Sequence, residues 1–254
     1  MIATAEPPSV STAQIAELQA NGFLVLRQIT TAEDLARIAL LVAGLYRRYN
    51  HLARRGRAHD LGDDPDDRPQ ILEINQALDL EPALATTLTF RRCWRLAQRL
   101  LGKSVEHRFD HTIYKPAFNG AATAWHQDEA YTLDRNLVTL HFWVPLHDVS
   151  VEMGCMQFIP GSHRETVRRH RRRTRHAHAL ETDDIDISRA VACPVQAGDA
   201  TVHFARTLHY TGPNLTGRPR TAWSLEFGPR LQLPFRVYSK AKLAWRKTLS
   251  FARP

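Results

Sequence analysis

Apolar residues recur at helical spacing through the first hundred residues of the chain and at shorter, strand-like spacing after Gly102. Residues 11–22 are predicted to form a short helix, because a serine can cap its start and an Asn-Gly pair can end it. The run at 22–26 is typical of a short buried strand. The clearest helix is predicted over Thr31–Tyr49, where acidic residues occupy the first turn and apolar residues form one stripe. A further helical region is predicted from about Pro82 to Leu101, and Gly102 would end it.

After Gly102 the apolar runs are short and are separated by glycine, proline and asparagine. The predicted strands lie at 105–115, 137–146, 156–160, 191–196, 200–205 and 220–228. Residues 54–69 are polar and rich in turn formers, so an exposed loop is predicted there. Short strands with few helices between them favour an antiparallel sandwich or barrel over a parallel sheet. We therefore expect a mainly β protein (α+β) with one domain over residues 1–254, in which a helical support region at 12–101 braces a jelly-roll core at 103–230.

Residue parity predicts which face of two strands is packed against apolar neighbours and which face lines an interior. In 137–146, one face would carry only apolar side chains, namely Val138, Leu140, Phe142 and Val144. The other face would carry Thr139, His141 and Trp143, a mixed set suited to the lining of a site. In 220–227, large apolar residues likewise alternate with Arg220, Ala222, Ser224 and Glu226. These alternations indicate a barrel with one polar-lined interior.

Composition narrows the class of protein. Apolar residues make up 43% and charged residues 24% of the 254 residues, which excludes wholesale disorder. The three cysteines form neither a disulfide framework nor a zinc pattern, and we expect a reducing cytoplasmic location. The N-terminus resembles no signal peptide, and no apolar stretch is long enough for a membrane span.

The net charge of +8 raises the question of nucleic acid. Much of the excess lies in Arg164–Arg175, and the acidic stretch Glu181–Asp186 that follows can pair with it. No aromatic residue interleaves these arginines, so a platform for base stacking is missing. The favoured interpretation is a solvated mobile loop at 164–190. A lid that attracts an anionic substrate is the second interpretation, and an arm that binds nucleic acid is the third.

A candidate metal site begins with His126 and Asp128 in Trp125-His126-Gln127-Asp128. In an extended segment these two side chains point to the same side, where they offer an imidazole and a carboxylate. One more histidine would complete the facial triad that binds Fe(II) and leaves positions open. Among thirteen histidines, His209 is the leading candidate because a strand and a turn surround it, and His203, of the same parity, is its rival.

Arg220 opens the next strand, eleven residues beyond His209. If its guanidinium points inward, it requires a planar anionic partner, and a carboxylate of a 2-oxo acid would bind it bidentately. Thr211 lies two residues beyond His209 and could offer a hydroxyl to the same carboxylate.

Four segments together resemble the phytanoyl-CoA dioxygenase family of Fe(II)- and 2-oxoglutarate-dependent oxygenases. They are Gly22–Leu26 with the helix that follows, Trp125–Asp128, Met153-Gly154-Cys155 leading into Ile159–His163, and Leu208–Asn214 continuing to Arg220. The resemblance implies a double-stranded β-helix (a jelly roll). It also implies iron held by His126, Asp128 and His209, and 2-oxoglutarate anchored by Arg220. Further contacts to 2-oxoglutarate are implied for Thr211, Trp143 and His111, with a supporting or structural role as the alternative for His111.

The resemblance implies an oxidoreductase that uses dioxygen and 2-oxoglutarate to hydroxylate, or otherwise oxidise at C–H, a small molecule, releasing succinate and CO2. Halogenation is disfavoured because related halogenases replace the motif carboxylate, and Asp128 is present here. The substrate is expected to be a small acidic or zwitterionic molecule, or an intermediate of specialised metabolism. His163 is expected to shape its loop, and His141 to face the interior, where it would touch substrate or pack in the core.

Two alternatives to the dioxygenase interpretation remain open. One is a non-catalytic jelly-roll binding module with a basic loop for nucleic acid or another polyanion. The other is a zinc-dependent hydrolase or isomerase that uses the same ligands. The sequence does not specify the substrate, the reaction outcome or the oligomeric state.

Overall fold

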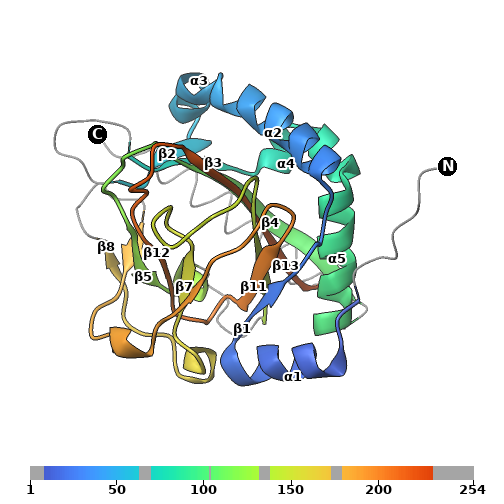
Figure 1. The fold of residues 1–254 in the computed structure, drawn as a ribbon, viewed down its shortest axis with the longest axis vertical. Helices are drawn as coiled ribbons and strands as arrows, with labels where there is room; N and C mark the ends of the chain where they lie inside the picture. The colour runs from blue at the N-terminus through green and yellow to red at the C-terminus, as the bar shows by residue number, and fades with distance from the viewer. Residues whose placement is uncertain (1–8, 63–69, 103, 132–137, 173–178, 231–254) are drawn as a thin grey trace.

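Two antiparallel sheets form the centre of the computed structural model, which describes residues 9–62, 70–102, 104–131, 138–172 and 179–230 (Figure 1). The larger sheet has seven strands, in the spatial order β1 (Phe23–Leu26), β11 (Ala200–Phe204), β6 (Leu140–Pro145), β13 (Arg220–Pro229), β4 (Val105–Lys115), β3 (Leu72–Asn75) and β2 (Ala58–Asp60). The smaller sheet has four, in the order β10 (Val191–Cys193), β7 (Met156–Phe158), β12 (His209–Thr211) and β5 (Thr123–His126). The short strands β8 (Arg171–Arg172) and β9 (Leu180–Glu181) pair separately. The predicted jelly-roll architecture is confirmed.

Helices cover the outer face of the larger sheet (Figure 1). The α-helices are α1 (Thr12–Asn21), α2 (Ala32–Tyr46), α3 (Tyr49–Arg54), α4 (Ala77–Leu80) and α5 (Leu88–Leu101). The 3-10 turns are η1 (Pro82–Thr86), η2 (Asp128–Tyr131), η3 (Ser162–Arg164) and η4 (Ile187–Arg189). One apolar core joins the buried stripe of α2 to α5 and to the outward residues of β6 and β13. The helices therefore brace the sheet, as the apolar stripe predicted.

Two predicted helices are each divided in the structure. The first ends at Tyr46, and a new helix begins after Arg48, whose backbone is not helical (φ −102°, ψ 11°). The second is interrupted at Thr87, which is extended (φ −71°, ψ 153°) and accepts a hydrogen bond from the Phe90 N–H. The start of α1 is as predicted: Ser11 forms a reciprocal cap, and Gly22 ends the helix in the left-handed region (φ 87°).

The exposed loop predicted at 54–69 is wrong at 58–60, and residues 63–69 lie outside the described residues. Residues 58–60 form β2, and Ala58 is buried. The carboxylate of Asp60 accepts the backbone N–H groups of Gly62, Gln70 and Ile71, which holds the polar connection in place. Together β1, β2 and β3 add three strands from the first hundred residues to the larger sheet.

The alternation predicted in β6 and β13 matches the structure. Leu140, Phe142 and Val144 lie in the helix-side core, whereas Trp143 lies in a second core between the two sheets. Val138 is an exception, because it is 54% exposed. Across the inner face, His203 is opposite His141, and His141 is opposite Glu226. Beside that row, Trp143, Ser224 and His111 follow one another across β6, β13 and β4. None of the helices in the described residues is long and apolar enough to cross a membrane.

Candidate metal centre

His126, Asp128 and His209 converge between the two sheets. His126 ends β5 and His209 begins β12, and the two residues are partners in the antiparallel ladder. One ligand atom from each of the three residues lies within 4.8 Å of the others. The Nε2 atoms of His126 and His209 are 3.5 and 3.6 Å from the oxygens of Asp128. The structure thus brings together the three residues that the sequence singled out as iron ligands.

Backbone carbonyls fix the orientation of both imidazoles. Nδ1 of His126 lies 2.7 Å from the carbonyl oxygen of Ala124, and Nδ1 of His209 lies 2.9 Å from that of Thr207. A carbonyl can only accept a hydrogen bond, so each Nδ1 carries the proton. Each Nε2 therefore presents a lone pair toward Asp128, which is the tautomer that a metal ion requires.

Electrostatics at the site favours an ionised carboxylate and a neutral imidazole. Burial raises the pKa of Asp128, but the surrounding histidines lower it by more, so this pKa lies well below its ordinary value. Burial, and then the charge of His126, hold the pKa of His209 well below its ordinary value. A neutral imidazole and a carboxylate are the ligand forms that a divalent metal ion binds. The donor set therefore fits Fe(II).

A second pair of histidines contacts the same carboxylate. Nε2 of His203 and Nδ1 of His141 lie 3.3 and 3.2 Å from Oδ2 of Asp128. Ligand atoms of these three residues also lie within 4.8 Å of one another. The rival third ligand, His203, is therefore next to the site and not remote from it. In the described residues its Nδ1 has no hydrogen-bond partner, so its ring lacks the backbone anchor that orients His126 and His209.

Arg220 is buried at the inner face with an incomplete set of partners. It is 1% exposed, and its guanidinium lies 5.4 Å from the centre of the Trp143 ring. One terminal nitrogen donates to the carbonyl of Gly154 at 2.8 Å, and Nε has no partner in the described residues. Gly154 has a φ of 79°, and a Cβ there would collide with the carbonyl oxygen of Gly212. Burial lowers the pKa of Arg220 to about 10.

Lys115 is a second buried cation, and sequence reasoning did not single it out. It is opposite Arg220 in the β4–β13 ladder. Its Nζ donates to the carbonyl of Thr211 at 3.2 Å, to the Thr211 hydroxyl at 3.0 Å and to the carbonyl of Gly212 at 2.7 Å. Burial, and then the charge of Arg220, hold its pKa well below the ordinary value. Its proximity to Arg220 follows only from strand register, for which the sequence carried no signal.

His111 lies on the same inner face, two strands from Trp143, but it is already paired. Its Nδ1 is 2.5 Å from a carboxylate oxygen of Glu73 on β3. Burial lowers the pKa of His111, but the hydrogen bond and charge of Glu73 outweigh it, so the pKa is raised overall. This contact favours the alternative supporting role for His111.

His163 lies in the turn after β7. Its Nε2 lies 3.1 Å from the carbonyl oxygen of Gln19 at the end of α1, and its ring stacks on Phe204. These contacts hold the turn against α1, which agrees with the loop-shaping role expected for this histidine.

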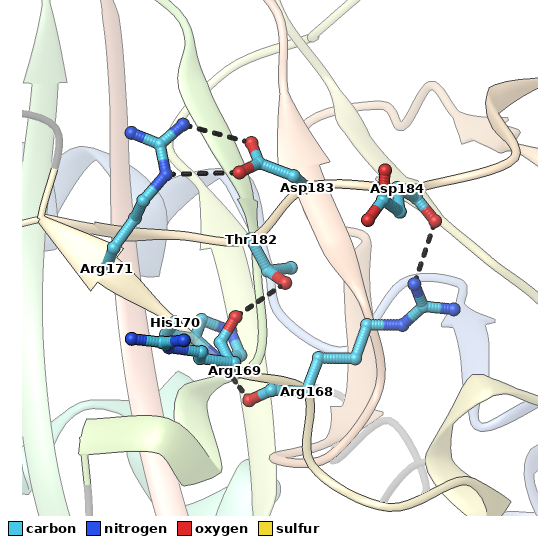
Figure 2. A pocket seen from close by; sticks show the side chains of 7 residues that line it. All are labelled: Arg168, Arg169, His170, Arg171, Thr182, Asp183 and Asp184. Carbon is cyan, nitrogen blue, oxygen red and sulfur yellow. Dashed lines mark hydrogen bonds and ion pairs between the residues drawn. The ribbon is translucent and has the colours of Figure 1, made fainter.

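The described part of the arginine-rich segment forms ion pairs, as its charge pattern predicted. Arg171 lies 3.0 Å from Glu181. It also lies 3.1 Å from Asp183, and Arg168 donates a hydrogen bond to the carbonyl of Asp184 at 2.8 Å (Figure 2). A cavity of about 460 Å³ lies here, lined by Arg168, Arg169, His170, Arg171, Thr182, Asp183 and Asp184. The mobility predicted for 164–190 stays a prediction, and residues 173–178 lie outside the described residues.

Comparison with known proteins identifies the family to which this fold and this set of side chains belong. The chain belongs to the phytanoyl-CoA dioxygenase (PhyH) family, whose model matches residues 18–222. The EvdO2 protein of Micromonospora carbonacea var. aurantiaca, solved in complex with 2-oxoglutarate, has a TM-score of 0.74 and 31% identity, over 87% of this chain and 91% of that one. The prediction of this family is confirmed.

Curated relatives match over shorter stretches. A probable alpha-ketoglutarate-dependent hypophosphite dioxygenase of Stutzerimonas stutzeri is 30% identical over 125 residues, which is 47% of this chain and 43% of that protein. The phytanoyl-CoA dioxygenase domain-containing protein 1 of Bos taurus is 32% identical over 119 residues, 44% and 41% of the two chains. The aligned part of this chain thus spans less than half the length of these relatives.

Proposed function

We propose that the chain is an Fe(II)- and 2-oxoglutarate-dependent dioxygenase that oxidises a C–H bond of a small polar molecule. The observation that carries this function is the pairing of two neighbouring features. His126, Asp128 and His209 offer three metal ligands within 4.8 Å of one another. On the same inner face, Arg220 and Lys115 are two fully buried cations. A metal triad beside a buried anion-binding position is what a chelating keto-acid with a second carboxylate requires.

In this proposal His126, Asp128 and His209 hold the iron, with both histidines oriented by backbone carbonyls. When bound, Fe(II) and 2-oxoglutarate supply the oxidising chemistry, in which 2-oxoglutarate and dioxygen yield succinate, CO2 and one oxygen atom for the substrate. The protein's residues supply position and exclude water. Asp128 would bind as the ionised carboxylate, since its pKa lies well below the ordinary value.

Arg220 would bind the far carboxylate of 2-oxoglutarate. Buried cations without a carboxylate partner are costly, and one carboxylate bound here would compensate one of the two charges and lie close to the other. Within the described residues, neither Arg220 nor Lys115 forms an ion pair with an acidic side chain. Thr211 would add its hydroxyl, which Lys115 holds in place at 3.0 Å. Trp143 packs against the guanidinium and would exclude water from this end of the site.

The substrate would approach from the part of the inner face that solvent reaches. Asp128, His141 and Glu226 have side chains 20%, 11% and 12% exposed. Glu226 is next to His141 across β13 and β6, and Nε of Arg108 is 3.9 Å from its carboxylate. A carboxylate and a guanidinium side by side complement the amine and carboxylate of a zwitterion. We therefore favour a zwitterionic or otherwise polar substrate over an aliphatic one.

An anaerobic titration tests this function without knowledge of the substrate. Fe(II) and 2-oxoglutarate added together to the full chain under argon are expected to give a weak visible charge-transfer band. Fe(II) alone, or Zn(II) with 2-oxoglutarate, should give none. A folded, iron-loaded protein that shows no band with 2-oxoglutarate would contradict the proposal, and turnover independent of dioxygen would favour the hydrolase alternative.

A further inference from the structure

We propose that the arginine-rich hairpin, that is strands β8 and β9 with the adjoining residues 168–170 and 182–184, supports the metal centre from outside, and that His170 is the positioning residue that connects them. The proposal rests on the function proposed above in one respect only, that His126 and Asp128 are metal ligands. It assigns a role to the basic segment that the charge pattern alone left open.

The first contact is to the peptide group between the two ligands. The backbone N–H of Gln127 donates to Nε2 of His170 at 3.0 Å. Nδ1 of His170 lies 2.8 Å from the carbonyl oxygen of Arg168, which can only accept. His170 is therefore held with the proton on Nδ1 and with Nε2 as the acceptor. An imidazole in this form fixes the orientation of the 126–128 peptide unit.

The side chain of Gln127 makes the second connection. It is fully buried, although the residues on either side of it face the metal position. Its Oε1 accepts the backbone N–H of Arg168 at 2.8 Å, and its Nε2 donates to the carbonyl of Arg206 at 2.7 Å. The middle residue of the motif thus joins the hairpin on one side to the segment between β11 and β12 on the other.

Further hydrogen bonds flank the ligands. The backbone N–H of Thr182 donates to the carbonyl of Trp125 at 2.9 Å, immediately before His126. The backbone N–H of Leu180 donates to the Tyr131 hydroxyl at 2.7 Å, and the Tyr131 ring meets the His126 ring edge-on. The hairpin is therefore bonded to the metal-binding segment before, between and after its two ligands.

The charges of the hairpin stabilise its own shape. Arg171 on β8 pairs with Glu181 on β9. It also pairs with Asp183 just after β9, and the Thr182 hydroxyl donates to the carbonyl of Arg169 at 2.9 Å (Figure 2). Arginines that are paired in this way are less available to a polyanion. The same pairs keep His170 and the Arg168 amide at the positions from which they reach Gln127.

A thermodynamic consequence follows, because coupling between two sites is reciprocal. If hairpin docking orders the ligands, then metal binding must in turn suppress local opening of the hairpin. Arg171 and Arg172 are exposed and lie on β8, so trypsin can report that opening by cleavage after either residue. Arg54 and Arg55, at the end of α3, are exposed sites on a different element and serve as the internal reference.

The experiment is a trypsin time course on the full chain, with and without Mn(II) plus 2-oxoglutarate, read by mass spectrometry. Cleavage after Arg171 and Arg172 is expected to slow by about 5-fold or more when Mn(II) binds. Cleavage after Arg54 and Arg55 should not change. Equal slowing at all four sites, or no slowing at Arg171 and Arg172, would overturn the proposal.

Three variants separate positioning from simple structural support. His170→Ala should weaken Mn(II) binding on the order of 10-fold and abolish the metal-dependent protection. His170→Gln, whose amide oxygen can accept the same N–H, should restore most of both. Arg169→Ala removes the side chain next to His170, and this variant should have the Mn(II) affinity and the metal-dependent protection of the unsubstituted chain. A His170→Ala protein that loses thermal stability but binds Mn(II) with unchanged affinity would refute the positioning role.

The two proposals fail in distinguishable ways. If the unsubstituted chain binds no Mn(II), the metal centre itself is wrong, and the role of the hairpin is overturned with it. If Mn(II) and 2-oxoglutarate bind normally while hairpin cleavage is unaffected, only the role of the hairpin is overturned. The protection measurement on the unsubstituted chain stands even if His170→Ala fails to fold.

Discussion

Arg220 and Lys115 face each other across β13 and β4 as two fully buried cations, in register in the ladder. Burying a charge without a counter-charge is unfavourable, and two together are more so. Their common position at one end of the inner face therefore indicates that an anion belongs there. In the proposed function, this anion is the far carboxylate of 2-oxoglutarate.

Arg220→Gln is expected to weaken 2-oxoglutarate binding by about 100-fold, since a charge-assisted bidentate contact contributes roughly 2–3 kcal/mol. The fold should be retained, because the change removes an uncompensated charge and no apolar contact of the core. Calorimetric titration with 2-oxoglutarate in the presence of Mn(II) measures the effect. Arg218→Gln, at an exposed arginine two residues away, is the matched control. Equal affinities in the two variants would rule out the assigned role.

Lys115 makes the stability of the ligand-free chain depend on pH. Its pKa in the folded chain lies well below the ordinary 10.5, so the unfolded chain binds more protons between these two values. The contribution of Lys115 to stability should therefore rise with pH through this window and be least favourable below it. Lys115→Met should lack this component. The unfolding free energy of both proteins is measured as a function of pH, and the difference between them isolates the contribution of Lys115. A difference that stays constant up to pH 10.5 would contradict the lowered pKa of Lys115.

Two sets of candidate metal ligands share Asp128, one with His126 and His209 and the other with His141 and His203, and variants distinguish them. His209→Ala should abolish measurable Mn(II) binding, because it removes one of three oriented ligands. His203→Ala should retain binding with a loss of about 10-fold, as expected for a group that hydrogen-bonds a ligating carboxylate. Equilibrium dialysis of the two variants side by side decides between them. The opposite ranking would make His203 the third ligand.

Asp34 ties α2 to the start of α5 and should contribute to stability in a pH-dependent way. Its carboxylate accepts the backbone N–H groups of Leu88 and Thr89, at 2.9 and 2.8 Å, and the Thr89 hydroxyl. Burial raises the pKa of Asp34, but these hydrogen bonds outweigh it, so the pKa lies below the ordinary 3.8.

The stabilisation by Asp34 should therefore be fully present above pH 3.8 and be lost as the pH falls through the lowered pKa. Asp34→Ala should cost about 2–3 kcal/mol near neutral pH, because it leaves the N-terminal N–H groups of α5 without their acceptor. Urea unfolding at neutral and acidic pH measures it. Asp79→Ala, whose exposed carboxylate lies 3.4 Å from Arg57, is the control, with an expected cost below about 1 kcal/mol.

Features of the chain that depend on short spacing could be predicted from the sequence. His126 and Asp128 share a side because they are two residues apart in extended chain, and the inward position of His141 and Trp143 followed from strand parity. The apolar stripe of α2 likewise predicted which face of that helix is buried. In each case the physical cause acts within a few residues, so a single sequence contains it.

The approach of His209 to His126 was predicted from the family resemblance, but other features that depend on pairing between distant segments were not predicted. Lys115 meets Arg220 only through the β4–β13 register, and His170 reaches Gln127 only because the hairpin folds back onto the motif. Strand β2 was assigned to a loop because His59 and Asp60 are polar. Its extended form depends on β3 and on the turn that Asp60 holds.

A crystal structure of the full chain grown with Mn(II) and 2-oxoglutarate under argon tests the central claim most directly. The account predicts one anomalous peak within coordinating distance of Nε2 of His126, a carboxylate oxygen of Asp128 and Nε2 of His209. It also predicts the far carboxylate of 2-oxoglutarate on the guanidinium of Arg220. Metal bound between Asp128, His141 and His203, or 2-oxoglutarate bound away from Arg220, would contradict it.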